Sequence, residues 1–138
     1  MLKPPVTVSM AFVRGLLDGV RARGIAVEPF LAEASIDGAL IDEASGRVTG
    51  EQYTALFRSI NMRLDDDGLG FFSRRLRVGS LALMMRSALG ASDLEVAMRR
   101  MARTFWMMQD DVELVTVREG PLAGWALRFG EGHGARPD

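Results

Sequence analysis

The segment Gly79–Val112, GSLALMMRSALGASDLEVAMRRMARTFWMMQDDV, decides the fold of this chain. It is apolar and rich in methionine, it is interrupted once at Leu89–Ser92, and it ends on two aspartates. On both sides of the interruption the apolar residues recur at intervals of three and four, which is typical of an amphipathic helix. We therefore predict two helices that pack against each other.

The second of these helices has a start signal of its own. Ser92 followed by Glu95 forms the S-x-x-E pattern of a capping box, so we expect Ser92 to be the N-cap. The helix then continues to about Gln109. The first helix covers Ser80–Leu89, and Gly90 closes it because glycine tolerates the left-handed conformation in which many helices end.

The hydrophobic period changes after this segment. From Val112 to Val117 the residues alternate as in a half-buried strand, and Trp125–Phe129 has the composition of a return strand. We predict a β-hairpin whose strands are joined by a turn over Arg118–Gly124. The glycine-rich end, Gly130–Asp138, is expected to be a flexible tail.

The first half of the chain is also predicted to be helical. Val6–Arg23 has helical periodicity, with Thr7 or Ser9 available as a cap. Gly15 and Gly19 lie inside this helix, and we expect them to allow the close approach of a second helix; the alternative is that they only weaken the helix. The remaining predicted elements are a short helix at Val27–Ser35, one turn at Ala39–Glu43, and a third main helix capped by Thr49 with Gln52 as its partner. Leu69–Arg74 is either a helical turn or a brief strand, and we favour the helical turn.

These elements define an α+β fold that is predominantly helical, with a small antiparallel β-hairpin near the C-terminus. A length of 138 residues suits a single domain, and we assign it to residues 1–129. A chain of this size buries enough surface to be stable without disulfides.

Composition excludes several classes of function. The chain has 17 Lys+Arg against 18 Asp+Glu, so it lacks the basic excess of a nucleic-acid-binding domain, and we expect no direct nucleic-acid binding by this chain alone. It has no cysteine, which fits a cytoplasmic protein. The apolar run Val78–Met85 is far shorter than the roughly 18–20 residues that span a bilayer, so we expect no membrane partner.

No catalytic or metal-binding signature is present in the sequence. The single histidine, His133, lies in the glycine-rich tail, where nothing would hold a general base in position. The acids Asp65–Asp67 are contiguous, whereas a calcium loop needs alternating ligands and a Glu at its twelfth position, which here is Leu76. We therefore expect a solvated helix stop at Asp65–Gly68, no metal, no cofactor and no enzymatic activity.

The segment that decides the fold also contains the candidate ligand site. Methionine is flexible and polarizable, which suits an adaptable apolar pocket, although core packing is the alternative at each position. Nearby arginines either pair with the acidic clusters at Asp65–Asp67 and Asp110–Asp111 or hold a ligand carboxylate. The residues that we predict to bind a ligand are Met84, Met85, Arg86, Met101, Phe105, Trp106 and Met108.

Four stretches, taken in order, resemble a known family. They are MAFVRGLLDGVRARGIAVEPFLAEASID (10–37), RVTGEQYTALFRSI (47–60), DDGLGFFSRRLRVGSLALMMRSALGASDLEVAMRRMARTF (66–105) and QDDVELV (109–115). Together they are similar to the N-terminal, arabinose-binding-like effector domain of AraC/XylS-type bacterial transcription regulators. The resemblance covers about Val6–Phe129.

This resemblance implies a cytoplasmic regulator that senses an unidentified small-molecule effector and forms a homodimer. It also implies a C-terminal helix-turn-helix domain that would bind DNA and that this sequence does not include. Members of the subgroup bind different effectors, so the resemblance does not imply arabinose in particular. The alternative is a protein–protein interaction or dimerisation module with no small-molecule ligand.

Overall fold

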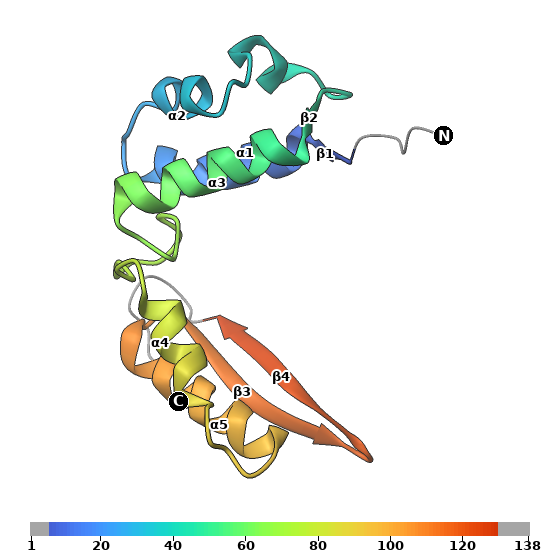
Figure 1. Ribbon diagram of the computed structural model, residues 1–138, viewed down its shortest axis with the longest axis vertical. Helices are drawn as coiled ribbons and strands as arrows, with labels where there is room; N and C mark the ends of the chain where they lie inside the picture. Colours follow the sequence, from blue (N-terminus) through green and yellow to red (C-terminus); the bar gives the residue numbers. More distant parts are fainter. Residues whose placement is uncertain (1–5, 130–138) are drawn as a thin grey trace. The chain divides into compact units, whose positions relative to one another are not determined.

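The computed structural model describes residues 6–129 and confirms the predicted α+β class (Figure 1). The chain divides into two compact units, Met1–Phe71 and Phe72–Asp138. Each unit contains helices and one antiparallel pair of strands. The predicted tail Gly130–Asp138, including His133, lies outside the described residues.

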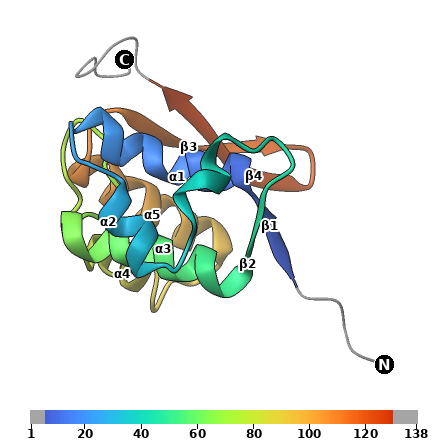
Figure 2. The same cartoon turned by 90° about the horizontal axis from the view of Figure 1, so that it is seen from above.

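The first unit is built on two main helices, each preceded by a short strand. Its elements are β1 (Thr7–Ser9), α1 (Met10–Ala22), α2 (Glu28–Glu33), the 3₁₀ helix η1 (Gly38–Asp42), β2 (Arg47–Thr49) and α3 (Gly50–Leu64). Strands β1 and β2 pair antiparallel, with Val8 opposite Val48, so α1 and α3 begin at opposite ends of this strand pair (Figure 2).

The start of the first helix differs from the prediction. The predicted helix began at Val6, but Thr7–Ser9 is a strand because these residues pair with β2, and β-branched side chains favour that conformation. The cap at Ser9 is confirmed: its side chain accepts a hydrogen bond from the Ala11 amide. Gly24 follows the helix at φ 69°, as expected for a glycine at a helix end.

The capping box of α3 is confirmed in full. The Thr49 hydroxyl accepts from the Gln52 amide at 3.1 Å, and the Gln52 side-chain oxygen accepts from the Thr49 amide at 2.9 Å. The Gln52 side-chain amide also donates to the Ser35 carbonyl at 2.6 Å, which ties the start of α3 to the end of α2. Asp65 ends α3 in the left-handed conformation.

The core of the first unit lies where α1, α2 and α3 meet. One face of α1 supplies more of the core residues than any other element does, as its helical periodicity predicts. The buried side chains are Met10, Val13, Leu16, Leu17, Val20, Val27, Phe30, Leu31, Ala34, Ile36, Val48, Leu56, Ile60 and Leu69.

No second helix packs closely against Gly15 or Gly19 of α1, so the prediction of a close helix–helix approach there was wrong. Nothing lies within 4 Å of a Cβ built on Gly15. A Cβ on Gly19 would instead overlap the carbonyl oxygen of Leu69, in the loop that follows α3. The helical turn predicted at Leu69–Arg74 was also wrong, because Leu69 and Gly70 have φ values of 53° and 83° and cannot continue a right-handed helix.

Asp66 contradicts the expectation of a solvated helix stop at Asp65–Gly68. Its side chain is fully buried. The carboxylate accepts hydrogen bonds from the amides of Gly68 at 2.8 Å and Gly70 at 3.0 Å, and Arg23 approaches it at 3.5 Å. This carboxylate therefore shapes the loop that packs against Gly19.

The second unit contains α4 (Ser80–Ser87), α5 (Leu94–Met108), β3 (Val112–Glu119) and β4 (Leu122–Phe129). The hairpin is confirmed, but the predicted turn over Arg118–Gly124 was too long. The strands extend to Glu119 and Leu122, and Gly120 takes φ 57° at the first position of the tight turn.

The N-cap of α5 is Asp93 and not Ser92. The Asp93 carboxylate accepts from the Val96 amide at 2.8 Å. Ser92 instead donates its hydroxyl to Asp93 at 2.9 Å. Aspartate and serine are comparable N-cap residues, so the residue at which α5 begins decides which of the two is the N-cap.

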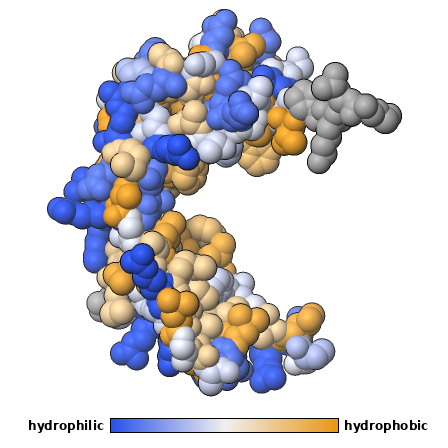
Figure 3. All heavy atoms as spheres, in the orientation of Figure 1, coloured by the Kyte–Doolittle hydropathy of each residue, from blue (hydrophilic) through white to orange (hydrophobic). Residues whose placement is uncertain are grey.

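The core of the second unit is smaller and lies between α5, the segment before α4, and β3. Phe72 meets Phe105 edge to face, with ring centroids 6.0 Å apart. Apolar side chains reach the surface of this unit in Figure 3, and α4 has no buried residue. The core residues are Leu76, Phe105 and Val112, with Phe72, Met84, Met108 and Leu114 packed against them.

Candidate functional site

The predicted ligand residues fall into three environments in the second unit. Met101 and Phe105 are buried, while Met84 and Met108 are partly buried. Met85 and Arg86 are exposed on α4. Trp106 is half exposed on α5.

The structure brings three of these residues together in one apolar cluster: Met84, Phe105 and Met108. The side chains of this cluster contact one another, so they fill the space between α4, α5 and β3. Of the predicted residues, Trp106 is the one that lines the pocket described next. Whether the methionines contact a ligand stays a prediction.

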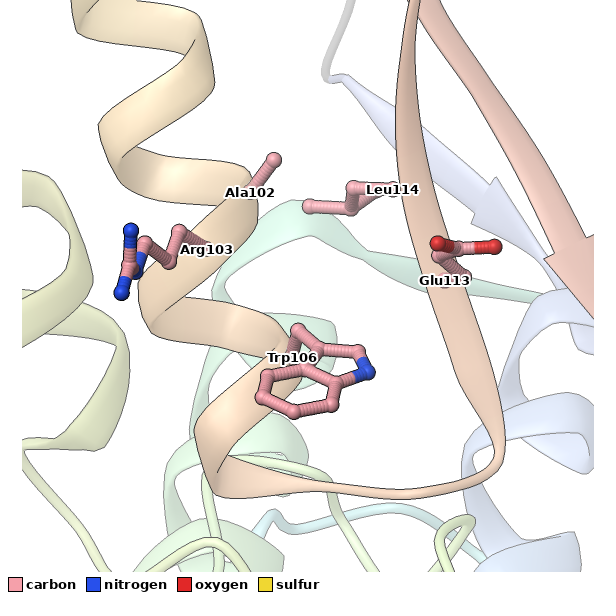
Figure 4. A pocket seen from close by; sticks show the side chains of 5 residues that line it. All are labelled: Ala102, Arg103, Trp106, Glu113 and Leu114. Atoms are coloured by element: carbon pink, nitrogen blue, oxygen red, sulfur yellow. The ribbon is translucent and has the colours of Figure 1, made fainter. Parts of the chain in front are cut away.

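This pocket lies between α5 and β3 and has a volume of about 240 Å³ (Figure 4). It is lined by Ala102, Arg103, Trp106, Glu113 and Leu114. In Figure 4 the Trp106 indole extends from α5 toward β3, where Glu113 lies. The Arg103 side chain extends on the other side of α5, away from Glu113.

Gln109 holds the strand that carries Glu113 in place. Its side chain is 1% exposed, and its carbonyl oxygen accepts from the amides of Asp111 and Val112, both at 2.8 Å. The same side chain donates to the Val112 carbonyl. One buried amide group therefore fixes where β3 leaves the end of α5.

The segment before α4 is attached to the same junction. The Ser73 hydroxyl donates to Asp111 at 2.6 Å, and the Ser73 amide donates to the same carboxylate. Arg74 donates to the Met107 carbonyl at 3.0 Å and lies 3.6 Å from Asp110. The expected pairing of an arginine with the Asp110–Asp111 cluster is confirmed for Arg74.

Glu113 is the unusual group in the pocket. Its Oε2 atom is buried and has no hydrogen-bond partner. Arg128 lies opposite Glu113 in the hairpin register, yet no hydrogen bond from it reaches this oxygen. A carboxylate oxygen that is shielded from water and unpaired is costly, so a ligand that supplies a donor or a positive charge would be stabilised there.

A second pocket, in the first unit, gives a useful contrast. Its volume is about 300 Å³, and its lining residues are Glu33, Ala55, Arg58, Ser59, Met62 and Arg63. The Glu33 carboxylate in this pocket already has partners within the protein. Arg63 pairs with it at 3.2 Å, and the Ser59 hydroxyl donates a hydrogen bond to it. The pocket between α5 and β3 is therefore the stronger candidate for a ligand site.

Sequence reasoning missed most of the pocket. Of its lining residues only Trp106 is among the predicted ligand residues; Ala102, Arg103, Glu113 and Leu114 are not. The available signal was an acid on a strand otherwise rich in valine and leucine, directly after a helix that ends in aromatic and methionine residues. Sequence spacing does not reveal that Trp106 and Glu113 line one pocket, because the chain must first reverse between α5 and β3.

The described part of the chain shows neither a metal site nor a membrane-spanning helix. Residues 6–129 contain no group of three or more acidic or histidine side chains arranged to hold a metal ion. None of the helices described there is long and apolar enough to cross a bilayer.

Comparison with known proteins agrees with the resemblance seen in the sequence. The family model for the arabinose-binding domain of AraC transcription regulators, which is an N-terminal domain, matches residues 24–138. No curated protein and no solved structure matches the chain significantly. Because the family model covers most of the chain, this protein belongs to the family of the N-terminal arabinose-binding domain of AraC transcription regulators.

Proposed function

We propose that this chain is an effector-sensing domain that controls a cytoplasmic transcription regulator. The observation that carries the proposal is the family match over residues 24–138. The family is one of regulatory ligand-binding domains, and we propose binding without turnover. DNA contact would then belong to a separate C-terminal domain, which agrees with the near-neutral charge of this chain.

The effector would bind in the pocket between α5 and β3. At about 240 Å³ the pocket is slightly smaller than typical ligand clefts, which measure about 300–1,000 Å³, so its occupant is the size of a small metabolite. The pocket combines an aromatic wall at Trp106 with one buried polar group at Glu113. Apolar walls with a few placed polar groups are typical of ligand sites.

Binding there would act on the junction between α5 and β3. The pocket draws its lining from both elements, and Gln109 couples the end of α5 to the start of β3. A ligand that touches both elements favours the arrangement in which they are close. Such a ligand shifts the equilibrium between two arrangements of α5 and β3 only if it binds one of them more tightly than the other.

We also propose that the hairpin mediates formation of a homodimer. Strands β3 and β4 form a two-stranded sheet among the described residues, and such a sheet is only marginally stable by itself. Leu122, Leu127 and Phe129 of β4 are strongly exposed. The same observation favours the second candidate function, an interaction module without a small ligand.

A thermal-shift screen of the full chain against a metabolite library that includes L-arabinose tests the sensing function. An effector at a hundredfold excess over its Kd should stabilise the protein by about 2.7 kcal/mol. Trp106→Leu should abolish the shift, whereas Phe57→Leu, at an exposed aromatic of the other unit, should leave it unchanged. A screen without hits, together with a dimer in sedimentation equilibrium, would favour the interaction module.

A further inference from the structure

The chemistry of the pocket between α5 and β3 narrows the class of its ligand. Glu113 lines this pocket, and the Oε2 atom of its carboxylate is buried and has no hydrogen-bond partner. A buried charge is stabilised best by an opposite charge brought into contact with it. A neutral hydroxyl donor would satisfy the hydrogen bond but would leave the charge uncompensated.

The second wall of the pocket is the Trp106 indole, which remains 48% exposed. Tryptophan attracts cations over its face more strongly than the other aromatic residues do. In Figure 4 the indole extends toward the strand that carries Glu113. An aromatic face and a carboxylate at one small site are a suitable pair of groups for an ammonium or guanidinium ion.

The other lining residues argue against a sugar. Ala102 and Leu114 offer apolar side chains, and Arg103 extends away from Glu113. A sugar has hydroxyl groups around its whole ring, and each one that enters such a site without a partner loses the hydrogen bonds it made to water. An organic cation with an apolar body needs only the carboxylate and the aromatic face.

We propose that the pocket between α5 and β3 binds a small organic cation, with Glu113 as its counter-ion and Trp106 as its aromatic wall. This inference rests on the proposed sensing function and names the ligand class of the same site. Arg103, at the far side of the pocket, repels a cation weakly and provides no contact that the ligand requires.

The test uses the full chain carrying Trp125→Phe, which leaves Trp106 as the single tryptophan. Choline and putrescine are titrated beside their neutral counterparts, 3,3-dimethyl-1-butanol and 1,4-butanediol, while Trp106 emission and binding heat are recorded. We expect at least one cation to bind saturably and about tenfold or more tightly than its neutral counterpart, as cation–π and charge contacts together allow. Added salt should weaken this binding, because the pocket is partly open to solvent.

Variants test whether Glu113 is the source of the preference for the cation. Glu113→Gln should remove the preference for the cation over its neutral counterpart. Glu119→Gln makes the same charge change on the same strand, at the turn end of the hairpin and outside the pocket, and should leave the preference intact. Arg103→Gln should leave cation affinity unchanged or raise it, whereas a fall in affinity would indicate an anionic ligand and overturn the inference.

Failure of this inference is distinguishable from failure of the proposed function. If L-arabinose or another neutral metabolite saturates the Trp106 signal while the cations do not bind, the cation site is refuted and the sensing function stands. If the cations bind equally well to Glu113→Gln, the role of Glu113 is refuted. If neither the cations nor any compound of the metabolite screen binds, both proposals fail.

Discussion

The carbonyl oxygen of Leu69 lies against the Cα atom of Gly19, in a position that any Cβ on Gly19 would overlap. The approach is reciprocal, since a Cβ on Gly70 would collide with the carbonyl group of Gly19. Helix α1 and the loop after α3 are therefore in contact through their backbones. Backbone atoms cannot move aside as the end of a flexible side chain can, so this contact requires glycine.

We predict that Gly19→Ala lowers the free energy of unfolding by about 1–3 kcal/mol or more, the usual cost of forcing extra volume into a packed site. Gly15→Ala, one turn earlier on the same helix, has nothing within 4 Å of its new Cβ. It should raise the free energy of unfolding by about 0.5–1 kcal/mol, because alanine is the better helix former. Urea unfolding of both variants measures the contrast, and equal effects would contradict it.

Asp66 shapes the loop that contacts Gly19. Its carboxylate accepts two backbone amides, from Gly68 and Gly70, in a fully buried position. Asp66→Asn places an amide group against one of these N–H donors, so we expect a loss of about 1–3 kcal/mol of unfolding free energy. Asp18→Asn, which removes an exposed ion pair with Arg21, should cost less than about 1 kcal/mol. A similar loss in both variants would mean that the Asp66 network adds nothing.

Asp93 predicts a pH dependence at the start of α5. The hydrogen bond from the Val96 amide, followed by the one from the Ser92 hydroxyl, lowers the pKa of Asp93 below its ordinary value of 3.8. A lowered pKa stabilises the folded state above the unfolded-state pKa of about 3.9, and this stability is lost as the pH falls through the folded-state pKa.

Asp93→Asn keeps an N-cap side chain but does not titrate. Urea unfolding from neutral pH down to below about pH 4 should show the stability advantage of the wild type over Asp93→Asn shrinking at the acidic end. An advantage that stays constant over this range would contradict the assignment.

The unpartnered oxygen of Glu113 predicts a stabilising substitution. Glu113→Gln replaces the carboxylate that holds this shielded oxygen by a neutral amide of the same size, so we expect the ligand-free protein to gain up to about 1 kcal/mol of unfolding free energy. Glu119→Gln, at an exposed position of the same strand, should change it by less than about 0.5 kcal/mol. A fall in stability for Glu113→Gln would instead indicate an ion pair with Arg128.

Gln109 predicts a link between stability and binding. Gln109→Leu leaves the buried amide of Val112 and the partly buried amide of Asp111 without their acceptor, which should cost about 1–3 kcal/mol in urea unfolding. Because the start of β3 then shifts, ligand affinity at Trp106 and Glu113 should fall as well. Met107→Leu, at an exposed position of the same helix, is the matched control and should change neither quantity.

Local signals were predictable from the sequence because a few neighbouring residues produce them. The Thr49–Gln52 capping box and the cap at Ser9 satisfy amides only two or three residues away, so their sequence patterns are sufficient. The choice of Asp93 over Ser92 was missed because both residues are good caps, and packing of α5 decides the register.

The candidate site was less predictable than the fold. The methionine-rich pattern of α4 and α5 pointed to Met84, Phe105 and Met108, which pack against one another in an apolar cluster. The pocket beside them needs Glu113, whose importance comes from an oxygen that the fold shields and leaves without a donor. No sequence pattern encodes the absence of a partner.

The sequence by itself determined the α+β class, the helical and strand periods, most caps and the family to which the chain belongs. These properties depend on residue type and short spacing, which the linear order contains. Only the tertiary structure decided that Gly19 receives a loop and not a helix, that Asp66 is buried, and that Trp106 and Glu113 share a pocket. Each of these depends on atoms brought together by packing and chain reversal, whose positions follow from the whole fold.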